Sequence, residues 1–473
     1  MSKFKKKEIA YKLIKSLYKN KNSLSVTLAG SYSEHFNINK AGDVDIIIIC
    51  KKLNKAFYDK CILTIKRFKD KYFHKRNLII NSTFGPIKFY KKNSIVFHLM
   101  IYDLKSHIQH TIKSPFTCYD WERSQFFIGK GLNKLSPVYQ LQYRDFLEAR
   151  RSIKEYLEDL SQNRISYREY LFEYSKVKLI KKYFKIDELN KRDFIYHVIK
   201  FLIINYIKYE KQSNIKVKNN QIEKKFSQIV NNKLDLNEFI KLKNQKYKKK
   251  LFDQDSRKLA IKFIKNFNKF LKRNEDNKIY FSRHKETKLN KKIFLGQKLN
   301  PVIIDKKNKK EFKNITIKKF YSSPAKRCID TAKIIGKRRK IIVNKNLKEI
   351  DYGDAEGLSL KKLSKKFPLI IKKWKEGLDP KFPNGENTYN VSARLNKFID
   401  NEIIHKEKSN TLIVTHNVVL RCLIGKYFSI NKKDWHKINI NYFDLLEFKL
   451  VNRRIVPNIE RKKYLYIFKN FFD

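Results

Sequence analysis

The sequence predicts a multidomain chain, in which two parts of mixed α/β structure flank a part built of helices. Its 473 residues, at roughly 150 residues per domain, are enough for two to four domains. Hydrophobic residues make up 42% of the chain and can bury several cores, which excludes a wholly disordered protein. The pattern of apolar residues changes twice along the chain, which predicts domains at residues 1–135, 136–276 and 277–473.

The first of these parts, residues 1–135, alternates short apolar segments with turns. Four segments have the length and the β-branched composition of strands, and they are separated by stretches that are more polar. These segments are SLSVTLAG at 23–30, DVDIIIIC at 43–50, NLIINSTF at 77–84 and SIVFHLMIYD at 94–103. We therefore expect an α/β domain here.

The middle part is expected to be helical from about 138 to 276, because glycine and proline are nearly absent and apolar residues recur at helical spacing. Examples are Phe146, Ile153, Leu157 and Leu160, and later Leu259, Phe263, Phe267 and Phe270. The basic segment KLKNQKYKKK at 241–250 predicts a solvated helix face or loop, with a surface for phosphate backbones as the alternative. The polar segment RNEDNK at 273–278 predicts the second domain boundary.

The charge of the chain is extreme, with 108 Lys and Arg residues against 46 Asp and Glu, a net charge of +62. Such a charge attracts phosphates, nucleic acids and anionic lipid surfaces. However, only 20 of the basic residues are arginines, the type that best recognises phosphates and bases. We interpret the abundance of Lys beside Ile and Asn as a coding bias toward AT-rich codons rather than as a nucleic-acid surface.

The cysteines and the apolar segments predict a cytoplasmic protein. Cys50, Cys61, Cys118, Cys328 and Cys422 form no CxxC pair, which indicates a reducing compartment without disulfides and gives no zinc site. The basic N-terminus lacks the apolar stretch of a signal peptide. The longest apolar segments are far shorter than the roughly 20 residues that span a bilayer, so we expect no membrane association.

In the third part, residues 277–473, two buried strands are expected to end in histidines. KIYFSRH ends at His284 and TLIVTH ends at His416. In α/β sheets, ligand sites lie at the carboxyl ends of the strands. Ser323 is expected to cap a helix that carries Arg327, with Pro324 as its first residue.

Two arginines and a glutamate accompany these histidines. Arg283 precedes His284, Arg327 lies in the predicted helix, and Glu349 lies in LKEIDYG. Such a set would form a cationic pocket for a phosphate. One histidine could attack phosphorus, while a carboxyl group protonates the leaving oxygen.

The order of these motifs resembles that of the histidine phosphatase (phosphoglycerate mutase-like) superfamily. Five motifs carry the resemblance: FSRHKETKLN, FYSSPAKRCIDTAKII, LKEIDYGDAEGLS, PNGENTYNVSARL and TLIVTHNVVLRCL. The resemblance implies a three-layer α/β/α fold, no metal cofactor, and hydrolysis of a phosphomonoester through a phosphohistidine. It implies that His284 is the nucleophile and Glu349 the general acid. Phosphoryl oxygens are then held by Arg283, Arg327 and His416, with Asn290 as a further phosphate contact.

Two positions depart from the usual motif, because Lys285 and Asn417 stand where glycine is normal. Lys285 would either contact an anionic substrate or crowd the pocket. The sequence LKEIDYGDAEG is more similar to the phosphatase and α-ribazole-phosphatase branch than to the mutases, and we therefore favour a phosphatase.

A second constellation lies in the N-terminal part. Gly30 and Ser31 follow a predicted strand, and Asp43 and Asp45 begin the next one. Side chains two residues apart on a strand lie on one side, where both carboxylates can share divalent cations. A Gly-Ser turn allows backbone amides to approach a triphosphate.

The pattern GS-x(11)-DVD resembles the DNA polymerase β-like nucleotidyltransferase superfamily. This resemblance implies an NTP substrate, Mg²⁺ as cofactor, a nucleotidyltransferase α/β fold and a helical module after it. It also implies a third carboxylate, for which Asp103 is the candidate. We interpret His98, His107 and His110 as surface or core residues rather than as a metal cluster.

The leading hypothesis is a bifunctional enzyme. One domain would transfer a nucleotidyl group from an NTP to an unknown acceptor, and the other would hydrolyse a phosphorylated small molecule. An RNA-end processing enzyme with a basic helical module is the first alternative. In the second alternative, one of the two catalytic domains is inactive and serves as a ligand-binding module.

Overall fold

The structure is a computed structural model, and it divides the chain into two compact units, Met1–Leu271 and Lys272–Asp473. The predicted boundaries at 135/136 and 276/277 stay predictions, and residues 274–277 lie outside the described residues. The structure describes residues 3–38, 43–81, 93–138, 141–173, 176–247, 256–273, 278–405, 409–428 and 430–471.

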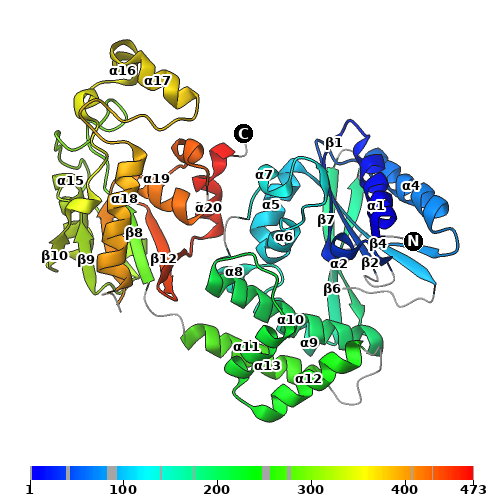
Figure 1. Ribbon diagram of the computed structural model, residues 1–473. Helices are drawn as coiled ribbons and strands as arrows, with labels where there is room; N and C mark the ends of the chain where they lie inside the picture. Colours follow the sequence, from blue (N-terminus) through cyan, green and yellow to red (C-terminus); the bar gives the residue numbers. More distant parts are fainter. Residues whose placement is uncertain are drawn as a thin grey trace. The chain divides into compact units, whose positions relative to one another are not determined.

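The N-terminal unit contains a five-stranded mixed sheet of order β3-β4-β2-β1-β5, followed by a two-stranded sheet and a group of helices (Figure 1). Its elements begin with α1 Lys3–Tyr18, β1 Ser23–Ala29, α2 Gly30–His35, β2 Asp43–Cys50, α4 Lys55–Tyr72, β3 Asn77–Asn81 and β4 Ser94–Asp103. They continue with α5 Leu104–Lys113, α6 Pro115–Trp121, β5 Phe127–Gly129, α7 Leu132–Leu135, α8 Asp145–Glu148, α9 Ile153–Ser161, β6 Arg164–Glu173 and β7 Lys176–Lys185. The last are α10 Glu188–Lys211, α11 Asn219–Val230, α12 Lys233–Tyr247 and α13 Ser256–Arg273.

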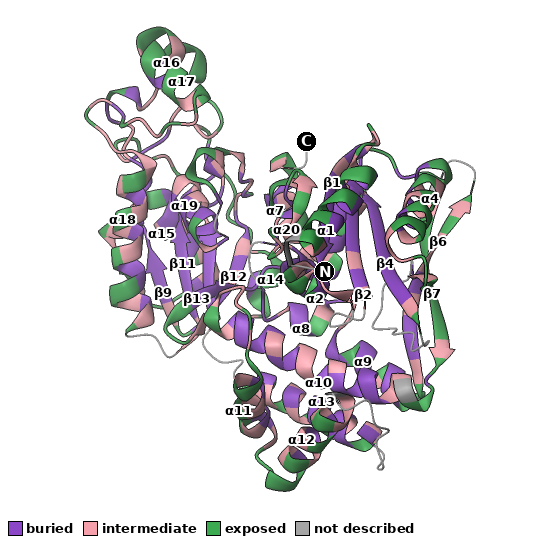
Figure 2. Cartoon of the chain, turned by 45° about the vertical axis from the view of Figure 1, so that its right-hand side comes forward, coloured by how far each residue is buried: buried purple, intermediate pink, exposed green. Residues whose placement is uncertain are grey.

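All four strands predicted in this unit are confirmed, as β1, β2, β3 and β4. The apolar side chains of β2 and β4 are almost all buried, as the purple strands in Figure 2 show, whereas those of β3 are half-buried. Residues 82–84, the end of the predicted strand 77–84, lie outside the described residues. Strand β2 lies between β1, to which it is antiparallel, and β4, to which it is parallel. A strand with a neighbour on each side and covered faces is expected to be continuously apolar, as Ile46–Cys50 is.

The expectation of helix throughout 138–276 is wrong for β6 and β7, which form an antiparallel hairpin from Arg164↔Lys185 to Glu173↔Lys176. Both strands are rich in the β-branched and aromatic residues that favour strands. Tyr170 also donates its hydroxyl hydrogen to the carbonyl oxygen of Ile101 in β4. The helical spacing predicted around Ile153 and Phe263 is confirmed by α9 and α13.

The C-terminal unit has a six-stranded sheet of order β10-β9-β11-β8-β12-β13 (Figure 1). Strands β10, β9, β11 and β8 are parallel to one another. Strand β12 is antiparallel to β8, and β13 is antiparallel to β12. Its strands are β8 Lys278–Arg283, β9 Lys319–Ser322, β10 Ile341–Val343, β11 Thr411–Thr415, β12 Leu445–Val451 and β13 Arg454–Pro457. Its α-helices are α14 Lys310–Lys313, α15 Lys326–Gly336, α16 Leu360–Lys366, α17 Pro368–Lys375, α18 Thr388–Phe398, α19 Asn417–Tyr427 and α20 Arg461–Ile467. Its 3-10 helices are η1 Lys345–Leu347, η2 Gly353–Ala355, η4 Lys432–Lys437 and η5 Lys469–Phe471, and η3 Ile399–Ile404 is a π-helix.

Helices cover both faces of this sheet. On one face, Cys328 and Ala332 of α15 pack in a cluster with Leu412 of β11. On the other, Tyr321 of β9 packs edge-on against Phe398 of α18, with 5.3 Å between the ring centroids. The unit is therefore an α/β fold in three layers.

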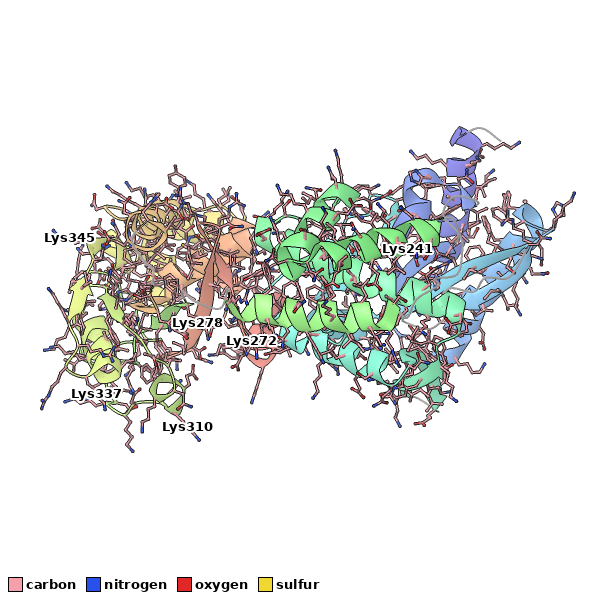
Figure 3. The ribbon with its side chains drawn as sticks, turned by 90° about the horizontal axis from the view of Figure 1, so that it is seen from below. Lys241, Lys272, Lys278, Lys310, Lys337 and Lys345 are labelled. Atoms are coloured by element: carbon pink, nitrogen blue, oxygen red, sulfur yellow. The ribbon has the colours of Figure 1, made fainter. Side chains whose placement is uncertain are left out.

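Many lysines extend from the surface of the protein, as Figure 3 shows for Lys241, Lys310 and Lys337, all of which are exposed. No helix among the described residues is long and apolar enough to cross a membrane.

Candidate active sites

The predicted histidines meet at the carboxyl edge of the C-terminal sheet. Strands β8 and β11 are parallel neighbours whose last residues, Arg283 and Thr415, are paired in register. His284 follows the first strand and His416 the second, and their ring centroids lie 5.1 Å apart. The backbone N–H of His284 donates to the carbonyl oxygen of Thr415 at 2.9 Å, which extends the pairing by one residue.

The imidazole of His284 is held in one tautomer. Its Nδ1 lies 2.6 Å from the carbonyl oxygen of Lys285, and because a carbonyl only accepts, Nδ1 carries the hydrogen. Nε2 then keeps a lone pair. Burial, together with the charge of Arg327, lowers the pKa of His284 well below its ordinary value. The side chain is therefore a neutral imidazole in a fixed orientation, with a lone pair on Nε2.

Two guanidinium groups adjoin His284. Arg327 of α15 donates through its Nη atoms to the carbonyl oxygens of Gly296 at 2.8 Å and Leu299 at 3.1 Å. Arg283 donates to the carbonyl of Ile440 at 2.8 Å. The Nε–H of each arginine is buried without an acceptor among the described residues. An unpaired buried donor is costly, and a phosphoryl oxygen would pair with it.

The carboxyl group of Glu349 lies in the same site, after the turn η1. It accepts hydrogen bonds from the backbone N–H groups of Ile350 at 3.0 Å and Val418 at 3.2 Å. Burial raises the pKa of Glu349 above its ordinary value, although these hydrogen bonds and both arginines oppose that shift. A carboxyl group that keeps its proton to a higher pH is suited to general-acid catalysis.

Arg394 holds the segment that carries Glu349, a role that the sequence analysis missed. Its guanidinium donates to the backbone carbonyls of Asn346, Lys348 and Glu349 at 2.6–3.0 Å. It also forms a two-pronged ion pair with Glu386, with both N–O distances at 3.0 Å. Both residues lie within the quoted motif PNGENTYNVSARL, but spacing alone does not reveal contacts to a distant backbone segment.

Ser323 is a second residue whose role the sequence analysis missed. Its Oγ lies 2.8 Å from Nε2 of His416. The expectation that Ser323 caps the helix, with Pro324 as its first residue, is wrong, because α15 begins at Lys326 with Ala325 at the N-cap position and no side-chain cap. The hydroxyl of Ser323 fixes the orientation of His416 instead.

The two glycine replacements cause no backbone strain, because neither Lys285 nor Asn417 has a positive φ. The Nζ of Lys285 is bound by Asp305 at 2.7 Å and by the carbonyl of Lys307 at 2.6 Å. The ammonium group of Lys285 therefore binds a neighbouring loop. The side-chain oxygen of Asn290 accepts from the backbone N–H and the hydroxyl of Thr287, and its predicted contact with a phosphate stays a prediction.

The N-terminal motif lines a cavity of about 540 Å³. Gly30, Ser31, Asp43 and Asp45 all lie on its wall. Gly30 has φ +68°, and a Cβ there would lie 2.1 Å from Oδ2 of Asp45. Glycine is therefore required for the turn to approach the carboxylate.

Asp103 is not part of this site, and the prediction that it supplies a third carboxylate is wrong. In the parallel pair β2–β4, His98 lies opposite Asp45, whereas Asp103 lies opposite Cys50 at the other end. Five residues of strand, at about 3.3 Å each, separate these levels by about 17 Å. The Asp103 carboxylate caps α5 by accepting from the N–H of Ser106 at 2.7 Å.

His98 occupies the strand position beside the two aspartates. Its Nε2 lies 3.6 Å from Oδ2 of Asp43, and its Nδ1 lies 2.9 Å from the side-chain nitrogen of Asn81. Among the described residues, no group of three or more His, Cys, Asp or Glu side chains is placed to hold a metal ion. His98, His107 and His110 are all buried, and His98 and His110 line the cavity.

Comparison with known proteins identifies the family of most of the C-terminal unit. Residues 279–457 match the histidine phosphatase superfamily (branch 1). A 2,3-bisphosphoglycerate-dependent phosphoglycerate mutase of Thermoplasma acidophilum is 27% identical over 178 residues, which cover 33% of this chain and 80% of the mutase. A protein of Mycobacterium tuberculosis named as bifunctional is 28% identical over 105 residues, or 22% of this chain. The chain thus spans only 29% of the length of this mycobacterial relative.

Solved structures of low identity also align with about two fifths of the chain. One is described as a putative α-ribazole-5'-P phosphatase from Escherichia coli, with 17% identity and a TM-score of 0.34 over 40% of this chain and 98% of that one. Another is a phosphoserine phosphatase from Entamoeba histolytica, with 19% identity and a TM-score of 0.35 over 39% of this chain and 95% of that one.

Proposed function

We propose that the C-terminal unit, whose residues 279–457 form a histidine phosphatase superfamily domain, hydrolyses a phosphomonoester of a small molecule through a phosphohistidine. The observation that carries the proposal is the arrangement around His284. Its Nδ1–H is fixed on a carbonyl oxygen, which leaves Nε2 as the nucleophile. The buried Nε–H groups of Arg283 and Arg327 have no acceptor among the described residues.

In the first step, Nε2 of His284 forms a bond to phosphorus while the bond from phosphorus to the ester oxygen breaks. Glu349 gives its proton to that leaving oxygen. The two arginines stabilise the negative charge that develops on the phosphoryl oxygens. In the second step, Glu349 takes a proton from water, whose oxygen attacks phosphorus and releases inorganic phosphate from the histidine.

A screen of phosphorylated metabolites tests this proposal, with release of inorganic phosphate as the measurement. The wild-type protein and His284→Ala are compared at equal concentration. We expect at least one substrate whose hydrolysis requires His284. A mutase would instead return an isomer with its phosphate moved, and the similarity of LKEIDYGDAEG to the phosphatase branch favours hydrolysis. Full hydrolysis by His284→Ala would contradict the proposal.

We propose as a second function that the N-terminal unit transfers a nucleotidyl group from an NTP to an acceptor. The support is that Gly30, Ser31, Asp43 and Asp45 line one cavity, with Gly30 packed against Asp45. Magnesium is typically bound by one or two carboxylates together with the phosphates of a substrate. The two aspartates fit that arrangement and would hold the ion, which supplies positive charge against the phosphates.

Labelled NTPs test this second function when they are incubated with the protein and a cell extract. We expect a product that acquires the label in the wild type and not in Asp43→Asn or Asp45→Asn. The His284→Ala variant is the matched control, because it alters only the other domain and should label the acceptor normally. Equal labelling by wild type and both aspartate variants would refute nucleotidyl transfer at this site.

A further inference from the structure

The cavity of the N-terminal unit contains an arginine whose side chain forms no ion pair among the described residues. Arg150 lines the same cavity as Asp43 and Asp45. Its backbone N–H donates to the carbonyl oxygen of Lys113 at 3.0 Å. Its guanidinium, however, forms no hydrogen bond or ion pair among the described residues, although Glu155 attracts it electrostatically.

Four other charged residues on the cavity wall differ from Arg150, because each of them has a partner of opposite charge. Arg151 pairs with Asp159 at 3.1 Å, and Arg123 lies 4.0 Å from Glu34. The acidic residues are engaged in the same way, since Asp120 pairs with Lys208 and Asp193 with Arg192. The charges of these residues are thus largely balanced within the protein.

Glu155 is the carboxylate that attracts Arg150 electrostatically, and it is already shared by other cations. Glu155 lies 3.5 Å from Arg168 and 3.3 Å from Lys181, and it also accepts from Ser166 at 3.0 Å. Burial, followed by repulsion from Arg168 and Arg151, lowers the pKa of Arg150 to about 10. Arg150 is partly buried, so its guanidinium is less hydrated than it would be at the surface, and an anion in the cavity would compensate that loss.

We propose that Arg150 anchors an anionic group, a phosphate or a carboxylate, of the ligand that occupies this cavity. A guanidinium is the side chain best shaped to bind either group through two parallel hydrogen bonds. Lys200 of α10 lines the same cavity and has no anionic partner among the described residues, so it adds positive charge to the site. The inference rests on the second proposed function for the role of this ligand as a substrate.

Two ligands of that function would carry such a group. One is the polyphosphate chain of the NTP, and the other is an anionic acceptor. In either case Arg150 selects negatively charged molecules and disfavours neutral ones, because binding a neutral group would leave the guanidinium unpaired. A phosphorylated acceptor would also connect the cavity with the phosphatase activity proposed for the other unit.

Trp121, which lines the cavity, supplies a measurement of binding. The full chain with His284→Ala is titrated with pyrophosphate and, separately, with malonate, and the part of the fluorescence change that disappears in Trp121→Phe is followed. We expect saturable binding whose Kd rises by about tenfold to a hundredfold in Arg150→Gln, the loss expected for a charge-assisted hydrogen bond. Arg67→Gln, at an exposed position with the same change of charge, should bind as the wild type does.

Thermal unfolding in the absence of ligand separates an anchor from a structural residue. Arg150→Gln removes an uncompensated charge, so its Tm should equal or exceed that of the wild type. A lower Tm would show that Arg150 stabilises the fold and would overturn the proposal. A Kd within twofold of the wild-type value, or no saturable response in the wild type, would overturn it as well.

Competition with Mg-ATP distinguishes the two sources of the anion. Mutually exclusive binding of ATP and pyrophosphate assigns Arg150 to the nucleotide polyphosphate, whereas simultaneous binding assigns it to the acceptor. Both results support an anion site. The labelling assay with Asp43→Asn is independent of these titrations, so failure of nucleotidyl transfer and failure of the anion site give different results.

Discussion

Replacing Glu349 by glutamine removes the proposed general acid of the C-terminal site and should change the stability of the fold only slightly. Glutamine keeps the shape and one carbonyl oxygen, which still accepts from Ile350 and Val418 as Oε1 does at 3.0 and 3.2 Å. The substitution removes only the longer hydrogen bond, which the N–H of Val418 donates to Oε2 at 3.4 Å. Removing that hydrogen bond should lower the free energy of unfolding by about 1 kcal/mol or less.

The chemical cost is larger, because an amide cannot protonate the leaving oxygen. General-acid catalysis contributes about 10²–10⁴ in rate, which corresponds to about 3–5 kcal/mol of transition-state stabilisation. We expect this loss in kcat/KM for an alkyl phosphate. For p-nitrophenyl phosphate, whose leaving group needs no proton, the loss should be small.

The pH profile provides a second measurement on the same variant. Burial raises the pKa of Glu349, so the protonated form that the first step requires persists above the ordinary pKa and is lost as the pH rises through the raised value. The activity of the wild type on the alkyl phosphate should therefore fall as the pH rises through the raised pKa of Glu349. The pH profile of Glu349→Gln should lack this alkaline decrease. An equal loss of kcat/KM on both substrates, or the same alkaline decrease in the variant as in the wild type, would refute the role of Glu349 as the general acid.

Three further predictions test other parts of the two sites. Arg394→Ala leaves Glu386 and three backbone carbonyls unpaired, so it should lower kcat. It should also lower the free energy of unfolding, measured by denaturant titration, by about 3 kcal/mol or more. An unchanged kcat would contradict the role of Arg394 in positioning Glu349. Lys285→Met should lower the free energy of unfolding and leave KM within about threefold of the wild-type value, because the Lys285 ammonium is bound by Asp305 and by the carbonyl oxygen of Lys307. A KM raised tenfold would show that Lys285 contacts the substrate. EDTA should abolish labelling by NTPs while phosphatase activity persists, and loss of both activities would contradict a metal-independent phosphatase.

The sequence predicted the elements of the C-terminal site well, because the site depends on local features. A strand that ends in histidine places that side chain at the sheet edge wherever strands are parallel, and this was sufficient to bring His284 and His416 together. The roles of Arg394 and Ser323 were missed, because both act through contacts with residues more than 40 positions away in the sequence.

The N-terminal site shows where spacing alone fails. Asp43 and Asp45 lie on one strand, so their separation in sequence fixes their separation in space. Asp103 lies on another strand, and its distance from them depends on the pairing register, which places it opposite Cys50 instead of Asp45. A shift of five residues in that register is invisible in the sequence and decides whether the carboxylate belongs to the site.

The hairpin of β6 and β7 was missed for a related reason. The segment lacks glycine and proline, which predicted a continuous helix, but its aromatic and β-branched residues pair across two strands. The hairpin is also joined to β4 by a hydrogen bond that the backbone N–H of Ile101 donates to the hydroxyl of Tyr170, a contact between distant parts of the chain.

Trapping of the covalent intermediate tests the central claim most directly. The protein is mixed with a ³²P-labelled substrate found in the metabolite screen and quenched in alkali within one turnover, and the labelled peptide is identified by mass spectrometry. The account predicts an acid-labile, alkali-stable phosphoryl group on His284 that is absent in His284→Ala. A phosphoryl group on any other residue, or full turnover without label on His284, would contradict it.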